Sequence, residues 1–154
     1  MRLVLDTNVL ISAFISRGLC SQLLEHCAET HELVTSEPIV AEIREKHLKK
    51  FRMPPPAVDE AVAALFVGME VVDPVSLAHP ISRDPDDDIV IATAVTGGCD
   101  AVITGDADLL VLAIHDSVRF LTPRDFWDFD HPPEVSTSCT TVRLTQVDEW
   151  RNPL

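Results

Sequence analysis

Acidic side chains are concentrated in the stretch Asp84-Pro85-Asp86-Asp87-Asp88, where four carboxylates occur within five residues. The apolar residues 89–92 follow directly and are typical of a buried helix. Aspartates are favoured at the N-terminus of a helix, because the side chain caps free N–H groups and its charge suits the helix dipole. Capping explains roughly one or two of the four carboxylates. The others could bind a metal ion, and Asp6 and Asp106 offer further carboxylates after apolar runs elsewhere in the chain.

Apolar runs of strand length alternate with helical segments along the chain, and these elements must position the acids. The predicted strands cover residues 2–5, 32–35, 71–72, 101–104 and 118–121, and the predicted helices cover residues 9–14, 20–29, 39–48, 57–69, 87–96, 109–113 and 123–129. Ser36 is expected to cap the third helix, with Pro38 in its first turn. The alternation predicts an α/β protein with three layers, α/β/α, and a mainly parallel central sheet.

The acids that flank these elements are expected to meet at one edge of the sheet. Asp6 and Asp106 each follow a predicted strand, while Glu42 and Asp88 lie near the starts of helices. In sheets of this kind, ligands bind beyond the carboxyl ends of the strands. Two carboxylates about 4 Å apart repel each other by roughly 4 kcal/mol at an effective dielectric near 20, so an ionised cluster needs a cation. Ligands that are all oxygen suit Mg²⁺ or Mn²⁺, and such a site predicts metal-dependent phosphoryl chemistry.

Four acidic blocks occur in order: Leu5-Asp6-Thr7-Asn8-Val9-Leu10, Ser36-Glu37-Pro38-Ile39-Val40-Ala41-Glu42-Ile43, Arg83-Asp84-Pro85-Asp86-Asp87-Asp88 and Thr104-Gly105-Asp106-Ala107-Asp108-Leu109-Leu110. Over about residues 1–129 they resemble the acidic blocks of the PIN-domain family. The similarity looks closest to the bacterial branch of VapC-type toxins from toxin–antitoxin systems. The resemblance implies an endoribonuclease that depends on Mg²⁺ or Mn²⁺ and cleaves single-stranded RNA.

The resemblance also implies the residues of the site. The metal-binding acids at the matching positions would be Asp6, Glu42, Asp88 and Asp106, with Asp108 as an accessory acid. Within the third block Asp88 is preferred as the ligand and Asp87 is the second choice, while Asp86 stays open as an alternative. Side chains expected to orient a carboxylate or a metal-bound water are Asn8 or Thr7, together with Thr104.

The net charge of −13 argues against a protein that binds nucleic acid tightly by electrostatics alone, because such proteins usually carry a basic patch. It is compatible with an enzyme whose carboxylates hold divalent cations, since bound ions invert the local field. VapC-type toxins often dimerise, so the expected partners are an RNA substrate, an antitoxin protein and a second copy of the chain. A basic antitoxin segment would complement the negative charge.

Several features predict a cytoplasmic protein with no membrane segment. No apolar run approaches the roughly 20 residues that span a bilayer, and the N-terminus lacks a signal pattern. The four cysteines form no CxxC pair, which favours free thiols in a reducing compartment. Composition changes after residue 129, so the chain is predicted to consist of a nuclease domain, residues 1–129, and a tail or arm, residues 130–154.

Other functions fit the sequence less well. A phosphatase of the haloacid dehalogenase type needs a second acid where Asn8 stands, and a lysine that is absent between Arg52 and Leu154. A receiver domain lacks both the paired acids and the lysine near Pro123. The six histidines form no HxH or HExxH motif, so catalytic zinc is not expected. The alternative that stays open is a PIN fold with weak catalysis that binds RNA or a protein partner.

Overall fold

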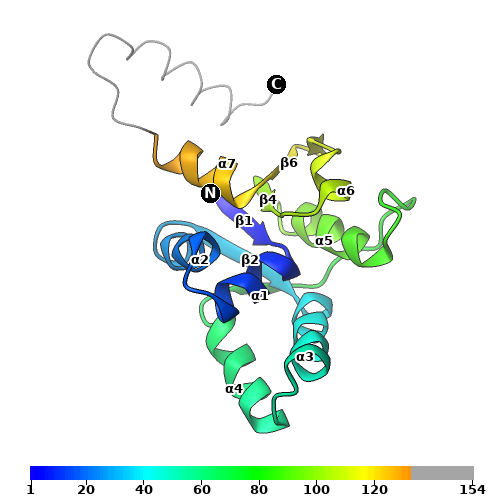
Figure 1. Ribbon diagram of the computed structural model, residues 1–154. Coiled ribbons are helices and arrows are strands. Elements are labelled where there is room, and N and C mark those ends of the chain that lie inside the picture. Colours follow the sequence, from blue (N-terminus) through cyan, green and yellow to red (C-terminus); the bar gives the residue numbers. More distant parts are fainter. Residues whose placement is uncertain (133–154) are drawn as a thin grey trace.

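The computed structural model describes residues 1–132, except for the side chains of residues 47–49. Its centre is a six-stranded sheet in the order β3-β2-β1-β4-β6-β5 (Figure 1). The strands are β1 (Arg2–Leu5), β2 (Glu32–Ser36), β3 (Glu70–Val72), β4 (Ala101–Ile103), β5 (Ile114–His115) and β6 (Val118–Leu121). All neighbouring strands are parallel except β5 and β6, which are antiparallel. The predicted class, α/β with a mainly parallel sheet, is therefore confirmed.

Helices cover both faces of this sheet. They are α1 (Thr7–Ile15), α2 (Leu19–Thr30), α3 (Glu37–Phe51), α4 (Pro55–Leu65), α5 (Pro85–Thr96), α6 (Ala107–Leu110) and α7 (Pro123–Asp130). The chain proceeds from β1 through β2 to β3 and then reverses, entering β4 on the other side of β1. Because parallel crossovers are right-handed, this reversal places α5 on the face opposite α1 and α2. Helix α7 returns to pack against α2 (Figure 1).

The two central strands lie in the core. Leu3, Val4 and Leu5 of β1 are all buried, as are the three residues of β4, so neither strand shows the alternation of a half-exposed sheet. Strands covered on both faces have this continuous apolar character. Phe126 of α7 is fully buried and closes the core on the α2 side. The ends of β1 and β4 are thereby packed into the core, and the acids Asp6 and Asp106 follow them in the chain.

Two local predictions were wrong and a third was correct only in part. Ser36 takes the N-cap position of α3, with Pro38 in the first turn, but its side chain forms no capping hydrogen bond, because its Oγ lies 2.9 Å from Thr93 Oγ1 in the interior. The predicted helix of residues 57–69 ends at Leu65, where the backbone leaves the helical conformation at Phe66. The predicted helix of residues 109–113 is the shorter α6, and its last residues lead into β5, which the sequence pattern did not reveal.

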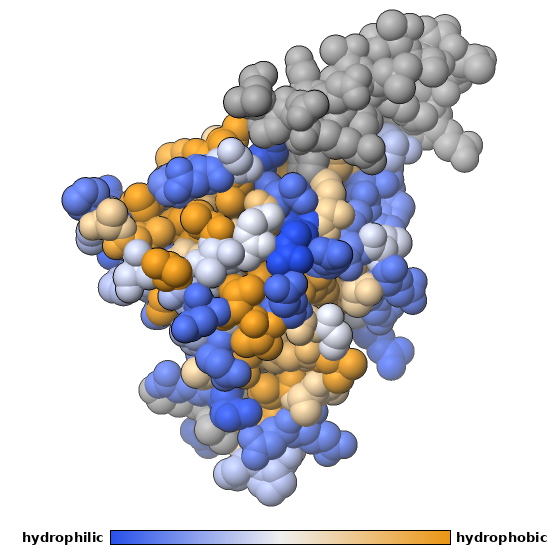
Figure 2. All heavy atoms as spheres, turned by 180° about the vertical axis from the view of Figure 1, so that it is seen from behind, coloured by the Kyte–Doolittle hydropathy of each residue, from blue (hydrophilic) through white to orange (hydrophobic). Residues whose placement is uncertain are grey.

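The described part of the chain includes no helix both long and apolar enough to cross a membrane. Apolar patches nevertheless remain between hydrophilic side chains on the face seen from behind in Figure 2. The predicted tail lies outside the described residues from residue 133 onward. The helix α7 extends through Asp130, and the division at residue 129 stays a prediction.

Candidate active site

The ends of β1 and β4 lie side by side at the point where the strand order reverses. Leu5 is in register with Ile103, and the backbone N–H of Asp6 donates to the carbonyl oxygen of Ile103 at 3.0 Å. Asp6 directly follows β1, and Asp106 follows β4 by three residues. In open α/β sheets a crevice forms outside the carboxyl ends of the strands at such a switch point. The topology therefore places these two carboxylates at the expected edge.

Asp6 is buried, with 5% of its surface exposed. Its Oδ1 accepts a hydrogen bond of 2.7 Å from the backbone N–H of Thr7, and its Oδ2 accepts one of 2.8 Å from Thr104 Oγ1. The hydroxyl oxygen of Thr104 also accepts from the backbone N–H of Asp106 at 3.0 Å. Thr104 thus joins the two acids, and both carboxylate oxygens of Asp6 are held in fixed positions.

Burial raises the pKa of Asp6 above its usual value, because the charged form loses hydration. The hydrogen bonds from Thr104 and Thr7 oppose that rise, whereas the negative charges of Glu42 and Asp106 add to it. Asp6 therefore experiences a surplus of negative charge at this edge of the sheet.

The third acidic block forms the start of α5, and its carboxylates have different roles. Asp84 caps the helix by accepting from the backbone N–H of Asp86 at 3.0 Å. Asp87 is buried, accepts from Ser82 Oγ at 3.0 Å, and brings a carboxylate oxygen within 4.8 Å of oxygens of Asp106 and Asp108. Its pKa is raised to about 6, chiefly by burial and further by the charges of Asp106, Asp84 and Asp6, while Ser82 opposes the rise.

Asp88 points elsewhere. Its Oδ1 accepts from the backbone N–H groups of Ile81 at 3.1 Å and Ser82 at 2.8 Å, so it fixes the loop before α5. It also lines a separate hollow of about 370 Å³ together with Pro38 and His79. The structure therefore brings Asp87, rather than the preferred Asp88, to Asp106 and Asp108.

Glu42 of α3 flanks the same edge. Its Oε2 accepts from Thr7 Oγ1 at 2.8 Å, and its Oε1 forms an ion pair of 2.8 Å with Lys46 one turn later. The pKa of Asp86 is raised by burial and next by Glu42, while Lys46 opposes the rise. The first turn of α5 and the middle of α3 therefore face each other across the acidic region.

The supporting residues differ in their roles. Thr7 connects the Asp6 end of β1 to Glu42, and Thr104 connects Asp6 to Asp106. Asn8 is exposed, and its side chain forms no hydrogen bond with any side chain or backbone that the structure describes. Ser82, which holds Asp87, was not predicted; its position two residues before the capping Asp84 is the one signal that could have suggested it.

The acidic group of Asp6, Asp87, Asp106 and Asp108, called the acidic centre below, suits a hard divalent cation. It offers only oxygen atoms, and its two buried members form no ion pair with any lysine, arginine or histidine whose side chain the structure describes. Buried charges are normally paired or bind metals. Oxygen ligands of this kind match Mg²⁺ and Mn²⁺. A hollow of about 350 Å³ beside Asp108, also lined by Ser82 and Arg83, leaves room for a ligand.

Comparisons with known proteins agree with this architecture. The family model described as PIN domain matches residues 2–108. VapBC2 from Rickettsia felis, bound to a DNA fragment from its promoter, gives a TM-score of 0.60 at 14% identity, covering 79% of this chain and 98% of that chain. VapBC-1 from nontypeable Haemophilus influenzae gives a TM-score of 0.59 at 15% identity, covering 80% and 99%. A search of curated proteins gave no match.

Proposed function

Because this chain belongs to the PIN domain family, we propose that its acidic centre is the active site of a metal-dependent endoribonuclease. One observation carries the proposal: an oxygen of the buried Asp87 lies within 4.8 Å of an oxygen of Asp106 at the switch point of the sheet, and the charge of the buried Asp6 interacts with both. Neither buried acid has an ion-pair partner among the side chains that the structure describes. The sequence resemblance to the PIN-domain family points to the same site.

Asp6, Asp87 and Asp106 would hold Mg²⁺ or Mn²⁺, with Asp108 as an accessory ligand and Glu42 at the flank. A divalent ion bound there supplies Lewis-acid polarisation of a phosphodiester and favours formation of a nucleophilic water. In this assignment Asp88 positions the loop of residues 81 and 82 instead of binding the ion.

The chain's own contribution is to fix the ligands in advance. Thr104 and the N–H of Thr7 hold the Asp6 carboxylate from both sides and favour its ionised form. Ser82 does the same for Asp87. Since the pKa of Asp87 is about 6, binding of a cation near that pH should release a proton from this side chain. Ligands held in this way need little rearrangement when the ion binds.

For the substrate we propose single-stranded RNA, as the family resemblance implies. The hollow beside Asp108 includes Arg83, which offers a cation beside the acids, whereas Lys46 on the other side is paired with Glu42. The net charge of −13 opposes long-range attraction of a polyanion. We therefore expect weak RNA binding without divalent ions, and a cleavage rate that is limited by the encounter of protein and RNA.

We further propose that the chain is the toxin member of a toxin–antitoxin pair. The two similar structures are VapBC complexes, and the acidic surface of this chain would complement a basic segment of an antitoxin. Self-association, which the resemblance also implies, stays a prediction that sedimentation analysis can test.

The proposal is tested by cleavage of an end-labelled single-stranded RNA in Mn²⁺, in Mg²⁺ and in EDTA. Wild-type protein and the control Asp128→Asn, which changes an exposed aspartate of α7, should cleave only with a divalent ion. Asp6→Asn should be inactive. If the wild-type protein binds the ion but cleaves none of several RNAs, the chain is a binding module with weak catalysis. If it binds no divalent ion, the acidic centre is not a metal site.

A further inference from the structure

A second group of potential ligands lies at the opposite end of the sheet. His26 is in the last turns of α2, His31 directly precedes β2, Asp130 ends α7, and His131 follows it. Asp6 and Asp106 follow their strands, whereas His31 precedes one, so the two groups lie at opposite edges of the parallel sheet. Nothing in the proposed nuclease site uses these histidines.

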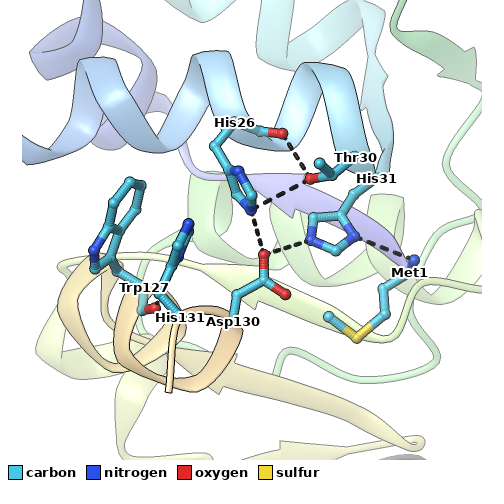
Figure 3. Close-up of polar contacts among 7 residues, drawn as sticks. All are labelled: Met1, His26, Thr30, His31, Trp127, Asp130 and His131. Carbon is cyan, nitrogen blue, oxygen red and sulfur yellow. Dashed lines mark hydrogen bonds and ion pairs between the residues drawn. The ribbon is translucent and has the colours of Figure 1, made fainter. Parts of the chain in front are cut away.

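Figure 3 shows how the side chains converge on Asp130. Its Oδ2 is in hydrogen-bonding contact with Nε2 of His26 and lies 2.9 Å from Nε2 of His31. His131 brings its ring to 4.3 Å from the ring of His26, measured between centroids, and stacks on Trp127 at 4.0 Å. One potential ligand atom each from His26, Asp130 and His131 lies within 4.8 Å of the other two.

We propose that His26, Asp130 and His131 form a binding site for a divalent transition-metal ion such as Zn²⁺. Two imidazoles and one carboxylate are a ligand set that zinc accepts, with the fourth position open to water. In a tetrahedral site with bonds of roughly 2.0 to 2.2 Å, ligand atoms are about 3.3 Å apart. The present spacing, at most 4.8 Å, needs only a small closure of the side chains.

His31 acts as a positioning residue in this site. The terminal amine of Met1, which is a donor, lies 3.4 Å from Nδ1 of His31, and this contact favours the tautomer with the ring hydrogen on Nε2. That Nε2–H donates to Asp130 and fixes the orientation of the carboxylate. Hydrogen bonds of this kind to metal ligands commonly tune affinity. The ring of His31 is itself held edge-on against the buried Phe126, at 5.7 Å between centroids.

The consequence of the site is structural. Asp130 and His131 belong to the end of α7, while His26 belongs to α2, so a bound ion would fasten the last described helix to the body of the domain (Figure 3). Imidazole ligands also separate this site chemically from the acidic centre, since nitrogen ligands suit Zn²⁺ and oxygen ligands suit Mg²⁺.

The test is zinc binding by untagged, metal-free protein, measured by competition with a chromophoric chelator. Wild type, the control His79→Gln and the acidic-centre variant Asp6→Asn/Asp106→Asn should each take up one Zn²⁺ at this site, and excess Mg²⁺ should not displace it. The variant His26→Gln/His131→Gln should lose that ion. Added Zn²⁺ should raise the melting temperature of the first three proteins and leave that of the last unchanged.

Single substitutions keep the test decisive if the double variant folds poorly. His131 is exposed, so His131→Gln should fold normally and bind Zn²⁺ at least about 10-fold more weakly. His31→Ala should weaken binding by about 10- to 100-fold, and His31→Gln, whose amide can still donate to Asp130, should restore most of the loss. Equal zinc binding by wild type and His131→Gln, or loss of zinc only in Asp6→Asn/Asp106→Asn, would overturn the proposal. The cluster would then be a hydrogen-bonded network that fastens α7 without metal.

Discussion

The hydroxyl of Thr104 donates a hydrogen bond of 2.8 Å to Oδ2 of Asp6, although the two residues are 98 positions apart in the chain. Both are buried, and the Thr104 oxygen also accepts from the backbone N–H of Asp106. A single hydroxyl thus connects the ends of β1 and β4 and orients the first carboxylate of the acidic centre. The hydrogen bond lies in the core, but it also orients a carboxylate of the acidic centre.

Thr104→Val should therefore impair both stability and activity. Valine has nearly the same shape but leaves the Asp6 carboxylate and the Asp106 N–H without their partner, so the free energy of unfolding should fall by about 1–3 kcal/mol. Metal-dependent cleavage should fall as well, because Asp6 loses its fixed orientation. Urea denaturation in EDTA and initial cleavage rates measure the two effects. Thr104→Ser keeps the hydroxyl and should stay close to wild type in both; equal losses in the two variants would contradict the role given to the hydroxyl.

The raised pKa of Asp87 predicts a dependence of stability on pH in metal-free buffer. The ordinary pKa of an aspartate, 3.8, rises to about 6 for Asp87 in the folded protein, so between these values the folded state binds more protons than the unfolded state. Stability should therefore decline as pH rises through this window. Asp87→Asn removes the effect, so its advantage over wild type should be near zero at about pH 4 and reach about 1–2 kcal/mol at about pH 7, after allowing for solvent screening.

Thermal unfolding of both proteins over this pH range, with EDTA present, measures that difference. Asp125→Asn, which changes an exposed acid of α7, serves as the control and should follow wild type. An advantage of Asp87→Asn that is as large at pH 4 as at pH 7 would contradict the assigned pKa, because a protonated Asp87 and the asparagine that replaces it are both neutral and should differ little.

Most of the fold could be predicted because its determinants are local. The buried runs of β1 and β4, the periodicity of α2 and the apolar run of α5 are visible in single windows of sequence. The two-residue β5 has no such signal, since it exists only by pairing with β6. Ser36 has the composition of a helix cap, but Thr93, 57 residues later, captures its hydroxyl. At this position the long-range hydrogen bond with Thr93 replaces the capping bond that serine favours locally.

The sequence predicted that the acidic blocks would gather at one edge of the sheet, but not which aspartate of the third block would lie beside Asp106. Consecutive residues of a helix point about 100° apart, so Asp87 and Asp88 face different directions. Which one faces Asp106 depends on where α5 begins, and Asp84 as the cap fixes that start. The histidine cluster gave no sequence signal, because His26 and Asp130 are 104 residues apart and meet only through the packing of α7 on α2.

An unpaired hydroxyl in β2 offers a prediction about stability alone. Thr35 is buried, and its Oγ1 has no hydrogen-bond partner among the described residues. Thr35→Val should raise the free energy of unfolding by about 1 kcal/mol, because it removes an unsatisfied polar group without changing the shape. Thr93→Val is the matched comparison: it loses the bonds to Ser36 and to the carbonyl of Ile89 and should destabilise by about the same amount. Urea denaturation measures both, and destabilisation by Thr35→Val would indicate a partner for that hydroxyl.

Because Asp87 is proposed as a metal ligand and Asp88 as a residue that fixes a loop, substitutions of these two adjacent acids should have different effects. In Asp88→Asn, the amide oxygen can still accept both N–H groups of Ile81 and Ser82, so the loop should persist. In Asp87→Asn, the acidic centre loses one buried carboxylate. A lost metal ligand costs several kcal/mol of transition-state stabilisation, which is about 100-fold or more in rate.

The most direct measurement compares Mn²⁺-dependent cleavage of one labelled single-stranded RNA by wild type, Asp87→Asn and Asp88→Asn under identical conditions. We predict that wild type cleaves only with the ion, that Asp87→Asn loses about 100-fold or more of the rate, and that Asp88→Asn stays within about 10-fold of wild type. Loss of activity in Asp88→Asn with activity retained in Asp87→Asn would contradict the proposed ligand set. Absence of Mn²⁺-dependent cleavage in wild type would contradict the nuclease itself.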